Sequence, residues 1–199
     1  LTERTRAIIV VNLFGHPGPL AELRSLADER GLVLIEDNAQ SPLATEQGRY
    51  AGTVGDIGVF SLNYHKHIHT GEGGVCVTDH DHFAERIQAI RNHAENIVKE
   101  NETADITNMI GFNFRPTELS AAVGLVQLDE IDRHVEARER PLTRLSDGLN
   151  GLEGISVPKV RDGCRHVYYT WSARLDENIG VDRELFCRAL VAEGFPVTG

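Results

Sequence analysis

The sequence predicts an α/β fold in which a mainly parallel sheet is flanked by helices. Two observations carry this prediction. Short runs that are apolar throughout recur along the first 80 residues, as is typical of strands buried on both faces. Segments with apolar residues at helical spacing alternate with these runs, which favours a parallel sheet covered by helices over an all-β or an all-α fold.

In the first half of the chain we expect four strands, at residues 7–14, 32–36, 57–62 and 74–78. Gly15 and the prolines that follow it close the first strand. A helix is expected next, with Gly31 as its stop, because one face carries Leu20, Leu23, Leu26 and Ala27. Another helix is predicted from a shared face of Phe83, Ile87, Ile90 and Ala94.

In the second half, residues 96–108 are polar and unpatterned, so we expect a loop there. Pro116 suits the first turn of a long helix, and Pro141 should break or kink that helix. Strands are predicted at 155–157 and 167–175, and a helix capped by Asp182 should run through Glu193. We expect a large domain over 1–128, then the linking long helix and part of a smaller α+β C-terminal domain over 129–199.

Composition narrows the class of protein. The 199 residues carry a net charge of −10, with 41% hydrophobic and 25% charged residues, which is ordinary for a globular domain and unlike a disordered chain. No segment concentrates positive charge, so a nucleic-acid partner is not expected. The longest strictly apolar run, residues 7–11, is too short to span a membrane.

The cysteines and the two ends of the chain add expectations about compartment and completeness. The three cysteines, at positions 76, 164 and 187, form no CxxC pair, so neither a zinc site nor a disulfide framework is indicated. A reducing cytoplasm fits this pattern best. The chain begins at Leu1 without a secretory leader and stops at Gly199 without a tail. We therefore expect an internal fragment of a longer protein.

Lys66 is the first candidate functional residue. It is one of only three lysines, and it lies between an apolar strand and a glycine-rich turn in the stretch FSLNYHKHIHTGEGG at 60–74. A lysine partly removed from water just past a buried strand is available for Schiff-base chemistry. The alternative is an amine that reaches the solvent, and this feature alone favours the alternative.

Asp37 favours the interpretation of Lys66 as a functional residue over that of a solvent-exposed amine. It ends a predicted strand at the carboxyl edge of the sheet, where open α/β sheets bind ligands. A carboxylate there can hold a protonated ring nitrogen, and the alternative is an N-cap for a following helix. Because the carboxyl ends of parallel strands meet at one edge, Asp37 and Lys66 can converge on one pocket.

Three further features surround the lysine. Ser61 can bind a phosphate oxygen, although a serine that satisfies local backbone is the common alternative. The glycines at 71, 73 and 74 permit close backbone approach to a ligand, but they match neither the dinucleotide-binding pattern nor the P-loop. Histidines at 65, 67 and 69 would share one face if extended, yet their spacing is not a recognised metal signature, so no metal is expected.

These motifs, taken in order, resemble the DegT/DnrJ/EryC1/StrS family of pyridoxal-phosphate (PLP) enzymes, the nucleotide-sugar aminotransferases. The matching stretches are IEDNAQS at 35–41, GDIGVFSLNYHKHIHTGEGGVCVTD at 55–79, RNHAE at 91–95 and GFNFRPTELSAAVGLVQL at 111–128. Ala94 stands where the family usually has glycine. The resemblance implies the type I, aspartate aminotransferase-like fold.

The resemblance also implies roles for residues. Lys66 would form the Schiff base with PLP, and Asp37 would pair with the pyridinium nitrogen. Gln40 would lie against the ring or its 3-hydroxyl, and Ser61 would hold the phosphate. Asn113 would reach the phosphate of the neighbouring subunit, so a homodimer with shared active sites is expected. Arg115 is a weaker candidate for binding a substrate anion.

The implied reaction moves an amino group from an amino acid, usually glutamate, to a keto sugar linked to a nucleotide. A PLP- or PMP-dependent sugar 3-dehydratase of the same fold is the nearest alternative, but that branch replaces the lysine by histidine. A non-catalytic PLP-binding regulator is disfavoured because Asp37, Ser61, Lys66 and Asn113 are all retained. A nicotinamide-binding domain is disfavoured because no glycine-rich phosphate turn follows the first strand.

Overall fold

The computed structural model describes residues 1–95 and 109–198, and the described chain forms two compact units. The first unit consists of residues 1–139 together with 160–170. The second consists of residues 140–159 and the chain from Trp171 onward. The polar segment predicted as a loop at 96–108 lies outside the described residues. The domain boundary predicted at residue 128 stays a prediction.

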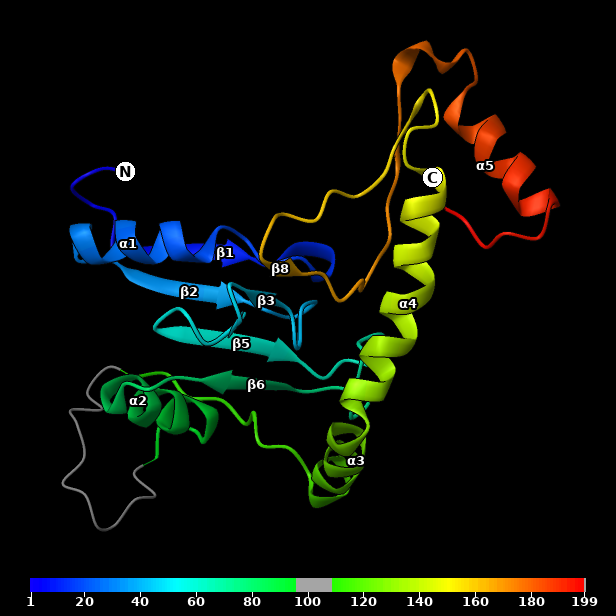
Figure 1. The fold of residues 1–199 in the computed structure, drawn as a ribbon. Helices are drawn as coiled ribbons and strands as arrows, with labels where there is room; N and C mark the ends of the chain where they lie inside the picture. The colour runs from blue at the N-terminus through cyan, green and yellow to red at the C-terminus, as the bar shows by residue number, and fades with distance from the viewer. Residues whose placement is uncertain (96–108, 199) are drawn as a thin grey trace. The chain divides into compact units, whose positions relative to one another are not determined.

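The centre of the first unit is a four-stranded sheet. Its strand order is β1 (Ala7–Val11), β2 (Val33–Asp37), β5 (Ile57–Ser61) and β6 (Gly74–Val77). The first three strands are parallel, and β6 runs antiparallel to β5 because a single loop joins them. Figure 1 shows the four strands side by side. The apolar runs therefore do mark strands, in a sheet that is mixed at one edge.

The first strand is shorter than predicted. It ends at Val11, and Leu13–Gly15 forms a short 3₁₀ turn (η1) in which Phe14 has a φ of +59°. A left-handed residue cannot continue a strand, so the apolar run and the strand do not coincide. The buried side chain of Asn12 marks the exit, where it donates hydrogen bonds to Glu36 and Asn38 at 3.2 and 3.1 Å.

Helix α1 (Leu20–Arg30) covers one face of the sheet. Leu20 and Ala27 are fully buried and pack with Val10 and Leu34 in the core. As predicted, Gly31 ends the helix, in the left-handed conformation at φ +59°. On the opposite face of β1, Ile9 is 68% exposed and Val11 is 50% exposed. The expectation that the sheet is covered on both faces is therefore wrong for β1, since strand side chains alternate and α1 packs on one face.

A small antiparallel sheet joins a distant part of the chain to the first unit. Its order is β4 (Arg49–Tyr50), β3 (Thr45–Glu46) and β8 (Cys164–Arg165). An ion pair between Arg161 and the nearly buried carboxylate of Glu46, at 2.8 Å, supports this pairing. Residues 160–170 are thereby held in the unit that contains β2 and β5.

Helix α2 (Asp81–Arg91) follows β6 and ends earlier than predicted. Ala94 lies beyond it with a φ of +56°, outside the helical region. Helix α3 (Glu118–Asp129) begins after Thr117, whose hydroxyl accepts a hydrogen bond from the Ser120 backbone at 3.1 Å. The prediction of Pro116 in the first turn is therefore wrong, because the threonine takes the N-cap and the proline precedes it.

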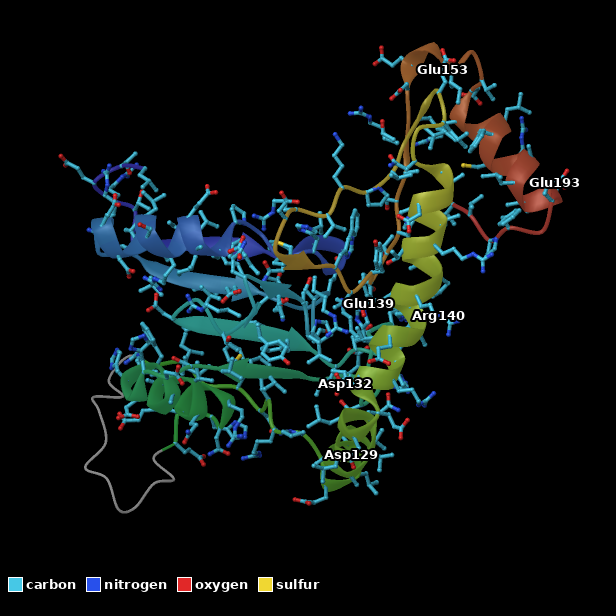
Figure 2. The ribbon with its side chains drawn as sticks, viewed as in Figure 1. Asp129, Asp132, Glu139, Arg140, Glu153 and Glu193 are labelled. Atoms are coloured by element: carbon cyan, nitrogen blue, oxygen red, sulfur yellow. The ribbon has the colours of Figure 1, made fainter. Side chains whose placement is uncertain are left out.

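Helix α4 (Ile131–Leu149) is separated from α3 at Glu130 and passes Pro141 without interruption. The prediction that Pro141 breaks the helix is therefore wrong, and a kink at Pro141 stays a prediction. The helix is held before the proline by buried Ile131 and Val135, and by two hydrogen bonds from Arg165 to Glu139, at 2.7 and 2.8 Å. Figure 2 labels Glu139, the last α4 residue of the first unit, and Arg140, the first residue of the second.

The second unit contains the antiparallel pair β7 (Ile155–Ser156) and β9 (Arg174–Leu175), the short turn η2 (Glu177–Ile179) and helix α5 (Arg183–Ala192). Asp182 caps α5 as predicted, since its carboxylate accepts from the Leu185 backbone at 3.2 Å. The strand predicted at 167–175 is wrong except at its end, because Tyr168 has a φ of +48° and interrupts extension.

Within the part of the chain that the structure describes, no helix is both long and apolar enough to cross a membrane.

Candidate functional site

The carboxyl ends of the parallel strands β1, β2 and β5 meet at one edge of the sheet. Asp37, the last residue of β2, is paired with Val11 on one side and Val59 on the other. Paired residues of parallel strands face the same way, and Ser61 lies two residues beyond Val59 on the same face. Asp37 and Ser61 therefore share one face at this edge.

The Asp37 carboxylate is half-buried and held locally. Its Oδ1 accepts a hydrogen bond from the Ala39 backbone at 3.1 Å, which closes a tight turn at the strand end. Turns, not a helix, follow Asp37, so the alternative of a helix N-cap does not apply. The turn presents the carboxylate at the edge where parallel sheets bind ligands.

The neighbouring Glu36 points to the opposite face and is completely buried. Its carboxylate accepts three backbone hydrogen bonds, from Gly52, Val54 and Gly55, at 2.6, 2.7 and 2.6 Å. The Asn12 amide donates a fourth at 3.2 Å. Glu36 thus fixes the loop between β4 and β5 to the strand that carries Asp37. A carboxylate inside an otherwise apolar strand was the signal that could have identified this role.

Lys66 lies in the loop between β5 and β6. Backbone hydrogen bonds close the loop at its base, from Leu62 to Gly73 at 2.9 Å and from Thr70 to Leu62 at 3.0 Å. The Lys66 backbone donates a hydrogen bond to the Asn63 carbonyl at 2.9 Å, which closes a turn that ends at the lysine. Its side chain is half-buried, and the Nζ atom lies 4.7 Å from the centre of the Tyr169 ring.

The three histidines around Lys66 lie in different environments. Because the loop turns, the extended arrangement considered from the sequence does not occur. His67 is buried and its Nε2 donates to the Val167 carbonyl at 3.0 Å, whereas His65 is exposed beside Tyr64. Burial lowers the pKa of His67, and the charges of Arg138 and Lys66 lower it further. Among residues 1–95 and 109–198, no three metal-ligating side chains gather into a cluster.

Ser61 and Gln40 are both tied to backbone near this edge. The Ser61 hydroxyl oxygen accepts from the Asn63 backbone at 3.3 Å, so its proton can be donated to another group. Gln40 Oε1 accepts from the Phe14 backbone at 2.8 Å, which fixes the amide beside the exit of β1. The Phe14 carbonyl in turn accepts from Thr170 at 3.3 Å, next to the tyrosine that contacts Lys66.

Asn113 and Arg115 lie elsewhere on the first unit. Asn113 forms an isolated bridge with Asn92, and the Arg115 guanidinium hydrogen-bonds to the Asn92 side chain and to His93, the latter at 3.3 Å. Both residues are exposed. Among the contacts described for this chain, none joins Asn113 or Arg115 to Asp37 or to Lys66.

Asp37 and Ser61 thus share one face at the sheet edge, and Gln40 is fixed beside the exit of β1. Lys66 lies in the loop after β5 with the Tyr169 ring as its contact, and Asn113 and Arg115 lie at a surface. The convergence of Asp37 and Lys66 on one pocket stays a prediction.

Tyr169 contacts Lys66, and it was not identified as a candidate residue from the sequence. It lies 103 positions after Lys66, within a stretch predicted as a strand, so neither spacing nor a local motif indicated the pairing. The one indication in the sequence was its composition, because two of the four tyrosines in the chain, Tyr168 and Tyr169, are adjacent.

Comparison with known proteins identifies the family. Residues 1–198 match the DegT/DnrJ/EryC1/StrS aminotransferase family. A GDP-perosamine synthase from Caulobacter vibrioides is 33% identical over 195 residues, which cover 98% of this chain and 52% of that protein. The chain thus spans about half the length of the curated relatives it matches.

Solved structures agree with the sequence match. The chain aligns with S. venezuelae DesV in complex with a ketimine intermediate at a TM-score of 0.85 and 33% identity, over 98% of this chain and 50% of DesV. It aligns with E. coli GDP-4-keto-6-deoxy-D-mannose-3-dehydratase with bound hydrated PLP at a TM-score of 0.84 and 29% identity, over 98% and 53%. The predicted aminotransferase fold is confirmed, and the chain belongs to the DegT/DnrJ/EryC1/StrS aminotransferase family.

Proposed function

We propose that this chain forms part of a PLP-dependent aminotransferase that moves an amino group from an amino acid, with glutamate as the donor, to a nucleotide-linked keto sugar in amino-sugar biosynthesis. The observation that carries the proposal is the arrangement at the carboxyl edge of the sheet. Asp37 and Ser61 share one face there, and the half-buried amine of Lys66 follows in the next loop. The GDP-perosamine synthase relative supports a nucleotide-sugar substrate.

The residues present fit PLP by their chemistry. A carboxylate can pair with a protonated ring nitrogen, a hydroxyl can donate to a phosphate, and a primary amine can condense with an aldehyde. Asp37 lies between Val11 and Val59 on its face of the sheet, so apolar side chains flank the carboxylate. Such a surface suits a flat aromatic ring anchored at one nitrogen. The set therefore fits the charge and the functional groups of the cofactor.

Each side chain would then contribute one task. When bound, PLP supplies an electron-accepting ring that makes the α-proton of an amino acid acidic. The Asp37 carboxylate would hold the proton on the ring nitrogen, and Ser61 would bind the phosphate. Gln40, with its orientation set by Phe14, would contact the ring or its 3-hydroxyl. Lys66 would hold the cofactor and then carry a proton to and from the α-carbon at Nζ.

A second copy of the chain is the proposed partner. Helix α3 is apolar yet no residue in it is buried, and its side chains Leu119, Val123, Leu125, Val126 and Leu128 are exposed. The adjacent Phe112 and Phe114 rings stack at 4.9 Å and are exposed on either side of Asn113. An apolar surface of this kind favours association. It would bring Asn113 to the phosphate bound by the other subunit, with Arg115 available for a substrate anion.

A sugar dehydratase is the alternative function on the same fold. The similarity to the E. coli dehydratase supports this alternative. Lys66 favours transamination, since the dehydratase branch is expected to carry histidine at that position. The reaction with an amino donor separates the two functions.

The experiment supplies the full-length protein that contains this chain with PLP, glutamate and a panel of nucleotide-linked keto sugars, and measures 2-oxoglutarate and aminated sugar by mass spectrometry. We expect both products in equal amounts, and neither from Lys66→Ala. Lys159→Ala is the matched control, because Lys159 is an exposed lysine outside the site. Loss of oxygen from the sugar without gain of nitrogen would assign the dehydratase reaction instead.

The dimer has a separate test. Sedimentation equilibrium of the chain should give twice the 22.0 kDa mass, and Leu119→Glu on α3 should reduce it to the single-chain value. Val181→Glu, a charge placed at an exposed apolar residue of the second unit, should leave the mass doubled. A single-chain mass for the unaltered protein at all concentrations would contradict the proposed partner.

A further inference from the structure

The segment at 166–170 returns to the lysine loop from 100 residues away, within the same compact unit. It is anchored to the turn after β1 at two points. The Val167 backbone donates to the Gly15 carbonyl at 2.8 Å, and the Thr170 backbone donates to the Phe14 carbonyl at 3.3 Å. Tyr169 lies between these anchors, so the position of its backbone is set from both sides.

The conformation of this segment is locally fixed. Tyr168 is buried with a left-handed φ of +48°, its backbone donates to His166 Nδ1 at 3.0 Å, and the two rings stack at 4.0 Å. A methyl group added to Gly15 would lie 2.7 and 2.8 Å from the backbone nitrogens of Tyr168 and Tyr169. A strained backbone persists only where its surroundings enforce it, and such enforcement is common next to functional groups.

The lysine loop is attached to the same segment. His67, the residue after Lys66, is buried and donates from Nε2 to the Val167 carbonyl at 3.0 Å. The His134 ring hydrogen-bonds to the His67 carbonyl at 3.3 Å from the other side. The Arg138 guanidinium donates to the Tyr169 carbonyl at 3.4 Å. The backbone of Lys66 and the backbone of Tyr169 are therefore held in one network.

We propose that Tyr169 is a positioning residue for Lys66, and that the face of its ring sets where the amine lies. The inference rests on the proposed function, in which that amine holds the cofactor. The Nζ atom lies 4.7 Å from the ring centre, within the range of a cation–π contact. An aromatic face attracts the ammonium group without a hydrogen bond that must be broken, so it holds the chain of Lys66 while leaving the nitrogen accessible.

The test uses the ring current of Tyr169 as a direct reading of the contact. The chain contains lysines only at 66, 99 and 159, so [ε-¹³C]lysine labelling gives three NMR signals, and Lys66→Arg assigns one of them. We expect the Lys66 signal upfield of the exposed Lys159 signal, with no PLP added. Tyr169→Phe should keep the displacement, because it keeps the ring. Tyr169→Leu should move the signal to the position of Lys159.

A matched control removes another aromatic ring of the lysine loop. Tyr64 is exposed and its ring contacts that of His65, so Tyr64→Leu should leave the Lys66 signal in place. An undisplaced Lys66 signal in the unaltered chain would overturn the inference even if Tyr169→Leu failed to fold. So would a displacement that survives in a folded Tyr169→Leu variant.

The second readout is the rate at which PLP becomes attached to Lys66, measured by borohydride reduction and peptide mass spectrometry. Tyr169→Leu should slow attachment and Tyr169→Phe should restore it, with unchanged thermal unfolding in both. A displaced, Tyr169-dependent signal without any PLP attachment would refute the proposed function and leave the contact standing. Equal attachment in all variants would refute the positioning role alone.

Discussion

Replacing Glu36 by glutamine tests whether this buried carboxylate fixes the strand that carries Asp37. Each of its oxygens accepts two hydrogen bonds, Oε1 from the backbones of Val54 and Gly55, and Oε2 from Gly52 and the Asn12 amide. In glutamine one oxygen becomes an amide nitrogen, so two donors, at least one of them buried, lose their acceptor whichever way the amide lies. At about 1–3 kcal/mol for each unsatisfied group, the variant should lose about 2–6 kcal/mol of stability.

That loss is a large fraction of the total stability of a typical domain, about 5–15 kcal/mol. Urea unfolding followed by far-ultraviolet circular dichroism measures it as a lower midpoint. Glu29→Gln, on the exposed side of α1, is the control and should change stability by no more than about 0.5 kcal/mol. If Glu36→Gln unfolds within the same margin of the unaltered chain, Glu36 does not fix the strand in the way described.

Three further predictions follow from backbone geometry and from one buried histidine. Ala94→Gly should stabilise the chain by about 1 kcal/mol, because Ala94 has a φ of +56°, and a lower urea midpoint would contradict this. Gly58→Ala should cost about 1–3 kcal/mol or prevent folding, because the added methyl would lie 1.9 Å from the Gly52 carbonyl oxygen, and a midpoint equal to that of the unaltered chain would refute the close packing. Burial and the neighbouring His16 lower the pKa of His166 from 6.5 to about 4, so the unfolded chain binds this proton first. Stability should therefore fall by up to about 3 kcal/mol between pH 6.5 and pH 4 and change little through this group below pH 4. His166→Asn should reduce this fall in unfolding free energy with pH, as measured by denaturant unfolding at several pH values. An unchanged pH dependence would exclude His166 as its source.

Elements whose signals are local were predictable from the sequence. Gly31 ends α1 and Asp182 begins α5, because a cap needs only the few residues around it. The apolar runs that became β2, β5 and β6 were visible for the same reason. The position of Asp37 at the carboxyl edge followed once those strands were taken as parallel.

Features that depend on distant contacts were not predictable. Pro141 is tolerated within α4, where buried Val135 and the Arg165–Glu139 pair hold the preceding turns. The stretch at 167–175 has the composition of a strand, but its hydrogen bonds to the turn after β1 force Tyr168 out of the extended region. Tyr169 could not be assigned to Lys66 for the same reason, since the pairing depends on how the chain returns to the sheet.

We propose that the Lys66 amine is the group that holds PLP. The most direct test of this proposal is to mix the chain with PLP, reduce with borohydride and map the modified peptide by mass spectrometry. We expect one PLP-modified lysine, at position 66, with the modification much reduced in Asp37→Ala. Modification spread over all three lysines, or equal labelling at Lys66 with and without the Asp37 carboxylate, would contradict it.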